Sequence, residues 1–371
     1  MAKLGDIATY INGYAFKPQD WSDEGIPIIR IQDLTGNSYQ ANRYNGEYAS
    51  KYEVNDGDVL ISWSASLGVY IWHGEKAVLN QHIFKVVFDK ERISKDFFVH
   101  QVGLILENAA SDAHGATMKH LTKPVFDALP FYLPPYEKQC EIAEVLDKVT
   151  SLISLRKQQL AKLDELVKAR FVEMFGDPVV NSKRWPVETI ENHIDLLTGF
   201  PFDSSGYVSK GVNICGGLII MPQKIDWSAC KHWPQITGYE DYILRPNDIV
   251  IALDRPWISN GFKIAMVDRE HLPALLIQRT ARIRAVDINQ HYLMQSLLLG
   301  RFDKHCNITG SLVPHISPKD IKSYSVMIPP IELQNQFSTF VERVDQQKQT
   351  VQQSLEKLEL MKKALMQECF G

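Results

Sequence analysis

The residues most able to do chemistry in this sequence are a run of three charged side chains, Asp89, Lys90 and Glu91, and five scattered cysteines. A nuclease centre needs carboxylates clustered with a lysine, but three neighbours on one exposed turn point in different directions, so we interpret the run as solvated surface. The cysteines form no CxxC pair and have no histidine at zinc-finger spacing, which favours reduced, mostly buried thiols. They are Cys140, Cys215, Cys230, Cys306 and Cys369.

The segment LPPY at residues 133–136 resembles the Asn/Asp-Pro-Pro-Tyr motif of amino-methyltransferases. In that motif the polar first residue hydrogen-bonds the target amine, which Leu133 cannot do. Its counterpart further along the chain, IPPI at residues 328–331, is apolar in the same place. We predict that both segments are junctions where helices begin, because proline is tolerated at the start of a helix. With no glycine-rich phosphate loop either, we expect no catalytic, cofactor-binding or metal site in this chain.

The sequence is duplicated at an offset of about 190 residues, which is too long for a solenoid and suits a repeated domain. The matching segments keep their order along the chain. They are GYAF and GFPF, VNDGDVLI and LRPNDIVI, GATMKHLTKP and GSLVPHISPK, and LPPYEKQ and IPPIELQ. We therefore expect two related bodies, residues 1–135 and 177–330, each followed by a second type of segment.

The segments that follow the bodies, residues 136–176 and 331–371, lack internal proline and glycine. Their apolar residues recur at alternating steps of three and four, which predicts long helices with a coiled-coil seam. The order body, helix, body, helix favours an antiparallel pair that holds the bodies at opposite ends, related by an approximate twofold axis. Such a pair would act as a ruler, that is, it would fix the distance between the two bodies.

The bodies combine short runs rich in β-branched and aromatic residues with short helical stretches and many turns. This pattern predicts an α+β fold, with a partly antiparallel sheet and helices on one side in each α/β body. No apolar segment reaches about 18 residues and no signal peptide is evident, so we expect no membrane association and a cytoplasmic location.

The loops of the two bodies diverge although the frame is shared. WSASLGVYIWHGEKAVLNQH in the first is replaced by LDRPWISNGFKIAMVDREHLPALLIQR in the second. A protein that reads two different DNA half-sites needs this divergence, because side chains on loops touch the base edges. The formal net charge of −4 opposes this interpretation, since lysine and arginine supply most non-specific affinity for DNA.

With duplicated bodies, PPxExQ junctions, long helices and Leu-Asn-Gln-His at residues 79–82, essentially the whole chain resembles the specificity subunits of type I restriction-modification enzymes. The resemblance implies two target-recognition domains, each reading one half of a bipartite double-stranded DNA site. It also implies two modification subunits that pack on the helices, carry S-adenosylmethionine and methylate adenine. Added restriction subunits would use ATP and Mg²⁺ to translocate and cut DNA. Basic grooves on the partners would then supply the phosphate contacts that this negatively charged chain lacks.

The candidate DNA contacts are polar residues in loops or at strand ends, where Asn and Gln suit adenine and Arg suits guanine. In the first body they are Ser64, Ser66, Asn80, Gln81, His82, Thr117 and Lys119. In the second they are Arg255, Trp257, Ser259, Asn260, Lys263, Gln278, Arg279, Arg282 and Ser311. His120 and His315 occupy equivalent places, where each is either a phosphate or base contact or a packed histidine. Alternation along residues 277–284 puts Gln278, Thr280, Arg282 and Arg284 on one face and Ile277, Arg279, Ala281 and Ile283 on the other, and only one face can meet DNA.

Two other functions stay open. The first is an enzyme with an unusual site, for which turnover by the purified chain alone would be diagnostic. The second is a coiled-coil scaffold that joins proteins without sequence-specific DNA binding.

Overall fold

The computed structural model describes residues 1–36, 42–112, 122–306 and 315–371. The chain forms two compact units: the first unit comprises residues 1–157 and 353–371, and the second unit residues 158–352. The division falls inside the two long helices, α5 (Tyr136–Phe175) and α9 (Ile331–Phe370). The units therefore differ from the ranges predicted from the sequence, because each long helix contributes to both.

The first unit contains two sheets of four strands. One has the order β2-β9-β6-β7 with every pair antiparallel, and the other has the order β4-β3-β8-β5 with β3 and β8 parallel. The strands are β2 (Thr9–Asn12), β3 (Ile26–Ile29), β4 (Arg43–Tyr44), β5 (Glu53–Val54), β6 (Val59–Ser62), β7 (Gly68–Ile71), β8 (Ala77–Leu79) and β9 (Ile83–Val87). The first unit also contains β1 (Ala2–Lys3), paired with β10 (Pro130–Phe131), the helices α1 (Leu4–Ile7), α2 (Ile31–Leu34), α3 (Lys95–Asp112) and α4 (Lys123–Asp127), and two 3-10 helices at Pro18–Asp20 and Ser50–Tyr52.

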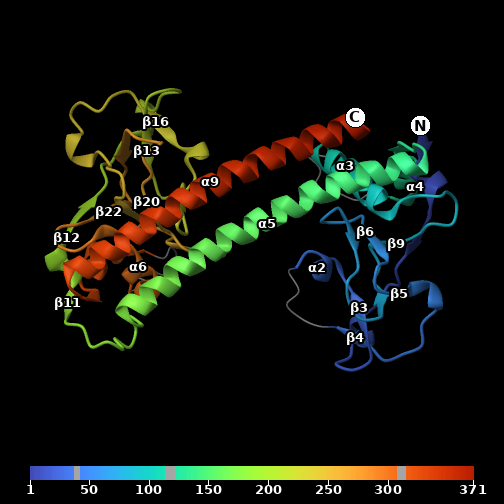
Figure 1. Cartoon of the computed structure of the whole chain (residues 1–371), viewed down its shortest axis with the longest axis horizontal. Coiled ribbons are helices and arrows are strands. Elements are labelled where there is room, and N and C mark those ends of the chain that lie inside the picture. Colours follow the sequence, from blue (N-terminus) through green and yellow to red (C-terminus); the bar gives the residue numbers. More distant parts are fainter. Residues whose placement is uncertain (37–41, 113–121, 307–314) are drawn as a thin grey trace. The chain divides into compact units, whose positions relative to one another are not determined.

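The second unit repeats this topology (Figure 1). Its main sheet has the order β12-β22-β17-β20, again all antiparallel, and its second sheet has the order β16-β13-β21 with β13 and β21 parallel. The strands are β12 (Ile194–Thr198), β13 (Val212–Cys215), β16 (Lys231–Trp233), β17 (Ile249–Ala252), β20 (Ile264–Met266), β21 (Ala274–Leu276) and β22 (Thr280–Ala285). The pair β11 (Val187–Thr189) and β23 (Ser325–Met327) corresponds to β1 and β10.

Several further elements complete the second unit. Two short hairpins are additional to the shared frame: β14 (Ile220–Met221) with β15 (Lys224–Ile225), and β18 (Trp257–Ile258) with β19 (Gly261–Phe262). The helices are α6 (Gln290–Leu299), α7 (Phe302–His305) and α8 (Pro318–Lys322). The second hairpin lies in the stretch where the two sequences diverge, so the divergence adds elements to a common frame.

The central strands β6 and β17 are buried throughout because each has a core on both sides. In β17, Ile249 and Ile251 pack in one hydrophobic cluster and Val250 packs in another. In β6, Ile61 and Leu60 divide between two clusters in the same way. Side chains alternate between the faces of a strand, so a continuous apolar run such as VLI or IVI is what a strand covered on both faces requires.

The glycines of GYAF and GFPF are required by close backbone approach. A Cβ added to Gly13 would lie 2.0 Å from the carbonyl oxygen of Asn80, and one added to Gly199 would lie 2.0 Å from that of Ile277. Only glycine leaves room for a neighbouring backbone at these distances. The repeated motif therefore marks the same close contact between two backbone segments in both units.

The glutamine of each PPxExQ junction hydrogen-bonds the start of a long helix to the body of its unit. Gln139 donates to the carbonyl of Pro134 at 2.9 Å and accepts from the amide of Ser94 at 2.9 Å. Gln334 donates to Pro329 at 2.7 Å and accepts from Asn289 at 2.8 Å. Because α5 and α9 begin directly after these proline pairs, the predicted junctions are confirmed.

Within each unit, parts of α5 and α9 run antiparallel. In the second unit Asp164 pairs with Lys348 at 2.5 Å, while further along α5 the Arg170 guanidinium lies 5.8 Å from the ring centre of Phe340. In the first unit, Lys157 pairs with Glu359 at 3.0 Å. In the second unit, residues further along α5 therefore contact residues nearer the start of α9, as expected for antiparallel helices.

Candidate nucleic-acid interface

The same pair of loops adjoins the end of the main sheet in both units. In the second unit the loop after β17 meets the turn between β21 and β22, where the Leu253 amide donates to the Arg279 carbonyl at 2.9 Å. In the first unit the Trp63 amide donates to the His82 carbonyl at 3.2 Å. We call these segments, residues 63–66 with 80–82 and residues 253–256 with 277–279, the paired loops.

The backbone of the paired loops follows one path in both copies. Ala65 and Arg255 have left-handed φ values of 60° and 47°, and His82 and Arg279 have values of 72° and 65°. Left-handed conformations are uncommon for residues other than glycine, so two matching pairs indicate a conserved backbone path. The side chains on this path differ: Ser64, Ala65 and His82 in one copy correspond to Asp254, Arg255 and Arg279 in the other.

In the second unit, Asp254 holds two cation-capable side chains at the surface. Its Oδ2 accepts from Nη1 of Arg279 and its Oδ1 lies against Nδ1 of His315, both at 2.7 Å. The Arg279 side chain is 74% exposed, whereas Asp254 is 25% exposed. Burial alone would raise the pKa of Asp254, but the hydrogen bonds from His315 and Arg279 lower that pKa below its usual value.

The sequence did not reveal Asp254 as a candidate interface residue. Its partners lie 25 and 61 residues further along the chain, so no motif or spacing marks it. The first unit has a different arrangement, in which Trp63 lies 4.9 Å from the His82 ring and donates from Nε1 to Asn12 at 3.2 Å. Trp63 was likewise absent from the predicted contacts.

The predicted contacts fall into four groups in the structure. The exposed ones are Ser66, Arg255, Ser259, Asn260, Gln278 and Arg279. The partly exposed ones are Asn80, Gln81, His82, Trp257 and His315. The buried ones are Ser64, Lys263 and Arg282. Thr117, Lys119, His120 and Ser311 lie outside the described residues.

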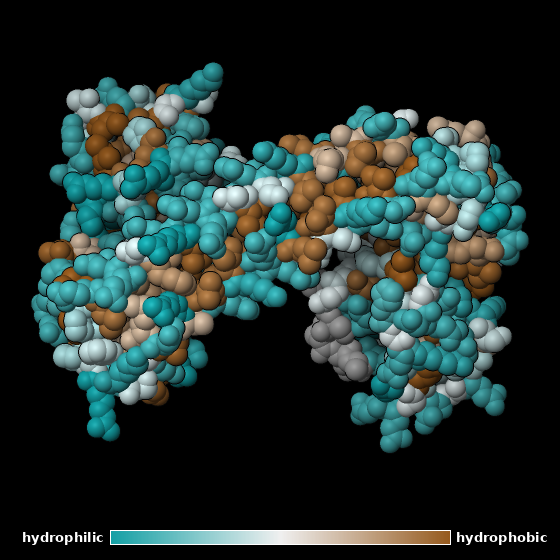
Figure 2. All heavy atoms as spheres, viewed as in Figure 1, coloured by the Kyte–Doolittle hydropathy of each residue, from teal (hydrophilic) through white to brown (hydrophobic). Residues whose placement is uncertain are grey.

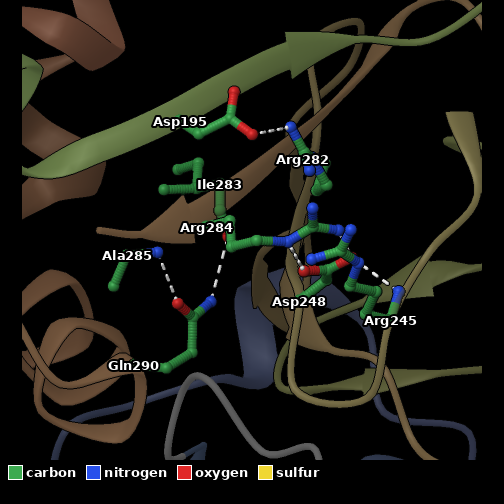
Figure 3. Close-up of polar contacts among 8 residues, drawn as sticks. All are labelled: Asp195, Arg245, Asp248, Arg282, Ile283, Arg284, Ala285 and Gln290. Carbon is green, nitrogen blue, oxygen red and sulfur yellow. Dashed lines mark hydrogen bonds and ion pairs between the residues drawn. The ribbon is translucent and has the colours of Figure 1, made fainter. Parts of the chain in front are cut away.

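The three buried residues correct the sequence-based prediction. Ser64 is 6% exposed. The Lys263 ammonium donates to the carbonyl of Gly217, and burial lowers its pKa. Arg282 is 4% exposed and donates from Nη2 to Oδ2 of Asp195 at 2.5 Å (Figure 3). These side chains stabilise the sheet and its loops, and are not available to a duplex in this conformation.

The strand face that carries Thr280, Arg282 and Arg284 is engaged within the unit and is not free to meet DNA. Thr280 is fully buried, and Arg284 uses Nε and Nη2 to bind both oxygens of Asp248 at 2.7 Å (Figure 3). The hydrogen bond and charge of Asp248 raise the pKa of Arg284. Alternation put Arg279 on the same face as Ala281, but Arg279 precedes β22 and its left-handed backbone breaks the alternation. The exposed candidate residues of this stretch, Gln278 and Arg279, therefore lie in the turn before β22 rather than along the strand.

The second unit also has a polar cavity of about 460 Å³ beside α6. It is lined by residues that include Asp164, Lys168, Lys224, His291, Asp345 and Lys348. His291 is 7% exposed, and its Nε2 has no hydrogen-bond partner among the described residues. Those residues contain no group of three His, Cys, Asp or Glu side chains arranged to hold a metal ion. No helix in the described ranges is long and apolar enough to cross a membrane.

We predict that His291 makes the second unit sensitive to mild acid. Burial lowers its pKa, although the nearby Asp345 and Glu342 carboxylates on α9 act in the opposite direction. A lowered pKa means that the unfolded chain binds the proton more readily, so stability falls as the pH drops below about 6.5 toward the folded value. His291→Gln should flatten the thermal-stability profile between about pH 7 and 5. An unchanged pH slope in this variant would contradict the prediction.

Comparison with known proteins first defines the class. Residues 1–165 match the model of the type I restriction modification DNA specificity domain. Over its whole length the chain is similar to two solved structures, an S subunit of a type I restriction-modification system from M. genitalium (TM-score 0.59, 13% identity) and a chain from a study of type I complex assembly (TM-score 0.53, 15% identity). The alignments cover 95% and 96% of those chains. The chain therefore shares the fold of these two chains.

The sequence relatives have the same description. The type I restriction enzyme MjaVIII specificity subunit of Methanocaldococcus jannaschii is 24% identical over 99% of this chain and 90% of its own length. The EcoBI specificity subunit of Escherichia coli is 29% identical over 61% of this chain, which spans less than half (44%) of that protein. The chain is thus similar over its whole length to type I restriction-modification specificity subunits, and its first 165 residues match the specificity-domain model.

Proposed function

We propose that this chain is the DNA-recognition subunit of a type I restriction-modification complex, in which each unit reads one half of a bipartite site. The observation that carries the proposal is the pair of loops with one backbone path and two sets of side chains. A shared backbone path would place both copies on DNA in the same orientation, while different side chains would select different bases. The MjaVIII and EcoBI relatives, both named as specificity subunits, support this role.

We also propose that the chemistry belongs to partners. Modification subunits, two per complex, would bind S-adenosylmethionine and flip the target adenine into their own pocket. Restriction subunits with ATP and Mg²⁺ would act on the assembled complex, and this chain would be non-catalytic. The long helices offer a surface for such partners, because apolar side chains gather there (Figure 2). Those exposed include Val145, Leu152 and Leu155 on α5 and Leu360 and Met361 on α9.

The partners would also supply positive charge. The chain has 40 basic and 44 acidic residues, which gives too little cationic surface for tight binding of the DNA backbone by itself. We expect the isolated chain to bind DNA weakly and the assembled complex to bind it tightly.

The finer arrangement is likewise a proposal: two target-recognition domains related by an approximate twofold axis and held by paired long helices that set the spacer. It predicts that inserting one turn into both helices lengthens the recognised spacer by one or two base pairs. Four residues add about 6 Å of helix, against about 3.4 Å per base pair. Methylation sequencing of the variant measures the spacer, and an unaltered spacer would refute the ruler.

Single-molecule methylation sequencing tests the proposal itself. Host DNA is compared with this gene and its neighbouring modification gene present, and again with this gene deleted. A bipartite methyladenine motif that disappears on deletion supports recognition and identifies both half-sites. An unchanged methylome favours a silent system or the scaffold, and methyl transfer by the purified chain alone would favour the enzyme.

A further inference from the structure

Arg279 has the geometry of an anchored anion-binding group. Its side chain is 74% exposed, yet one guanidinium nitrogen, Nη1, is held 2.7 Å from Oδ2 of Asp254. A guanidinium has five N–H donors, so this contact fixes its direction and leaves others for a ligand. Most exposed arginines must lose side-chain freedom on binding, whereas Asp254 has already restricted this one.

His315 adds a second group at the same carboxylate. Its Nδ1 lies 2.7 Å from Oδ1 of Asp254, and its backbone pairs with Asp254 in an antiparallel bridge. Both oxygens of Asp254 are therefore engaged, and its side chain is only 25% exposed. The surface presents the arginine and the histidine, with the carboxylate behind them.

The internal repeat indicates what such a cluster does. The position of Arg279 is taken by His82 in the first unit, with the same left-handed backbone and the same hydrogen bond from the facing loop. In the sequence, His315 aligns with His120. Arg279, which pairs with the carboxylate of Asp254, and His82 are different residues, but both side chains can carry positive charge at the same place in the two copies. A charge common to both copies suits the part of DNA that is common to all sequences, its phosphate backbone.

We propose that Arg279, positioned by Asp254 and accompanied by His315, is a phosphate anchor that sets the register of the second unit on DNA and reads no base. Bases are then read by residues that differ in kind between the copies, such as Arg255, whose equivalent in the first unit is Ala65. This inference rests on the proposed function, since it specifies how the same interface meets DNA.

The test measures DNA binding by the complex of this chain with its modification subunits. Fluorescence anisotropy at several salt concentrations gives the affinity for the cognate duplex and for duplexes with single base changes. We expect Arg279→Ala to weaken binding roughly tenfold on every duplex and to reduce the slope of log K against log salt by about 0.9, the value for one phosphate contact. The methylated motif should stay the same.

Three further variants separate an anchor from a structural role. Arg279→Lys keeps the charge and should restore the salt slope. Asp254→Asn releases the guanidinium, so it should weaken binding while the slope stays near that of the wild type. Arg269→Ala is the matched control: it removes an exposed arginine after β20, whose antiparallel pairing with β17 puts residue 269 beyond the opposite end of the sheet from Asp254. It should change neither affinity nor slope.

The outcomes distinguish this inference from the function on which it rests. If the wild-type complex yields no bipartite motif, the proposed function fails whatever the variants do. If the wild type yields the motif and Arg279→Ala relaxes one base position, Arg279 reads a base and the anchor is wrong. An unchanged affinity and slope in a folded Arg279→Ala complex overturns it equally.

Discussion

Replacing Asp248 by alanine should destabilise the second unit by about 3 kcal/mol. The Asp248 side chain is 2% exposed, and its two oxygens bind Nε and Nη2 of Arg284 and the amide of Arg245, each at 2.7 Å (Figure 3). Removing the carboxylate leaves a guanidinium on β22 without its counter-charge. Because Arg284 is still 22% exposed, water recovers part of the loss, and the effect lies at the low end for buried pairs.

Hydrogen exchange of peptides from β17 and β22 measures this effect within the second unit, because a single unfolding midpoint is ill-defined for a chain of two units. Lys322→Ala is the control, since Lys322 pairs with Glu191 at the surface at 3.0 Å and should contribute less than about 1 kcal/mol. Adding Arg284→Met to Asp248→Ala should restore much of the stability, because no unpaired charge then remains. A loss below about 1 kcal/mol for Asp248→Ala would show that the pair does not hold the sheet.

Replacing Phe171 by alanine should cost about 3–5 kcal/mol, the range for a large side chain removed from a packed core. Phe171 on α5 is fully buried. Its ring stacks on Tyr292 of α6 with centroids 5.5 Å apart and meets the edge of Phe337 of α9 at 5.5 Å. One side chain therefore joins three helices of the second unit, and its loss leaves a cavity among them.

The neighbouring residue provides a matched control. Val172 follows Phe171 on the same helix but is 44% exposed, so Val172→Ala should change stability by less than about 0.5 kcal/mol. Hydrogen exchange of peptides from α5, α6 and α9 should be faster in Phe171→Ala and the same as wild type in Val172→Ala. Equal exchange in both variants would mean that the helix pair is stabilised elsewhere.

The sequence by itself determined the features that depend on local pattern. The repeat is visible because the two copies keep the same glycines and proline junctions, and the helices α5 and α9 follow from apolar spacing that contains no helix breaker. The PPxExQ glutamines were visible as a motif, but their reason is tertiary. Gln139 and Gln334 each bind the amide of a residue 45 positions earlier in the chain.

Only the tertiary structure decided which polar residues can reach a ligand. Arg279 and Arg282 are three residues apart and look alike in the sequence, yet one is 74% exposed and the other is buried against Asp195. Strand alternation put Arg279 on the same face as the buried Ala281 and Ile283, because a pattern of period two takes no account of a single residue with a left-handed backbone. Asp254 is an example of a residue that the sequence did not single out. Its two partners, Arg279 and His315, lie on distant segments, and these contacts form only when the sheet is assembled.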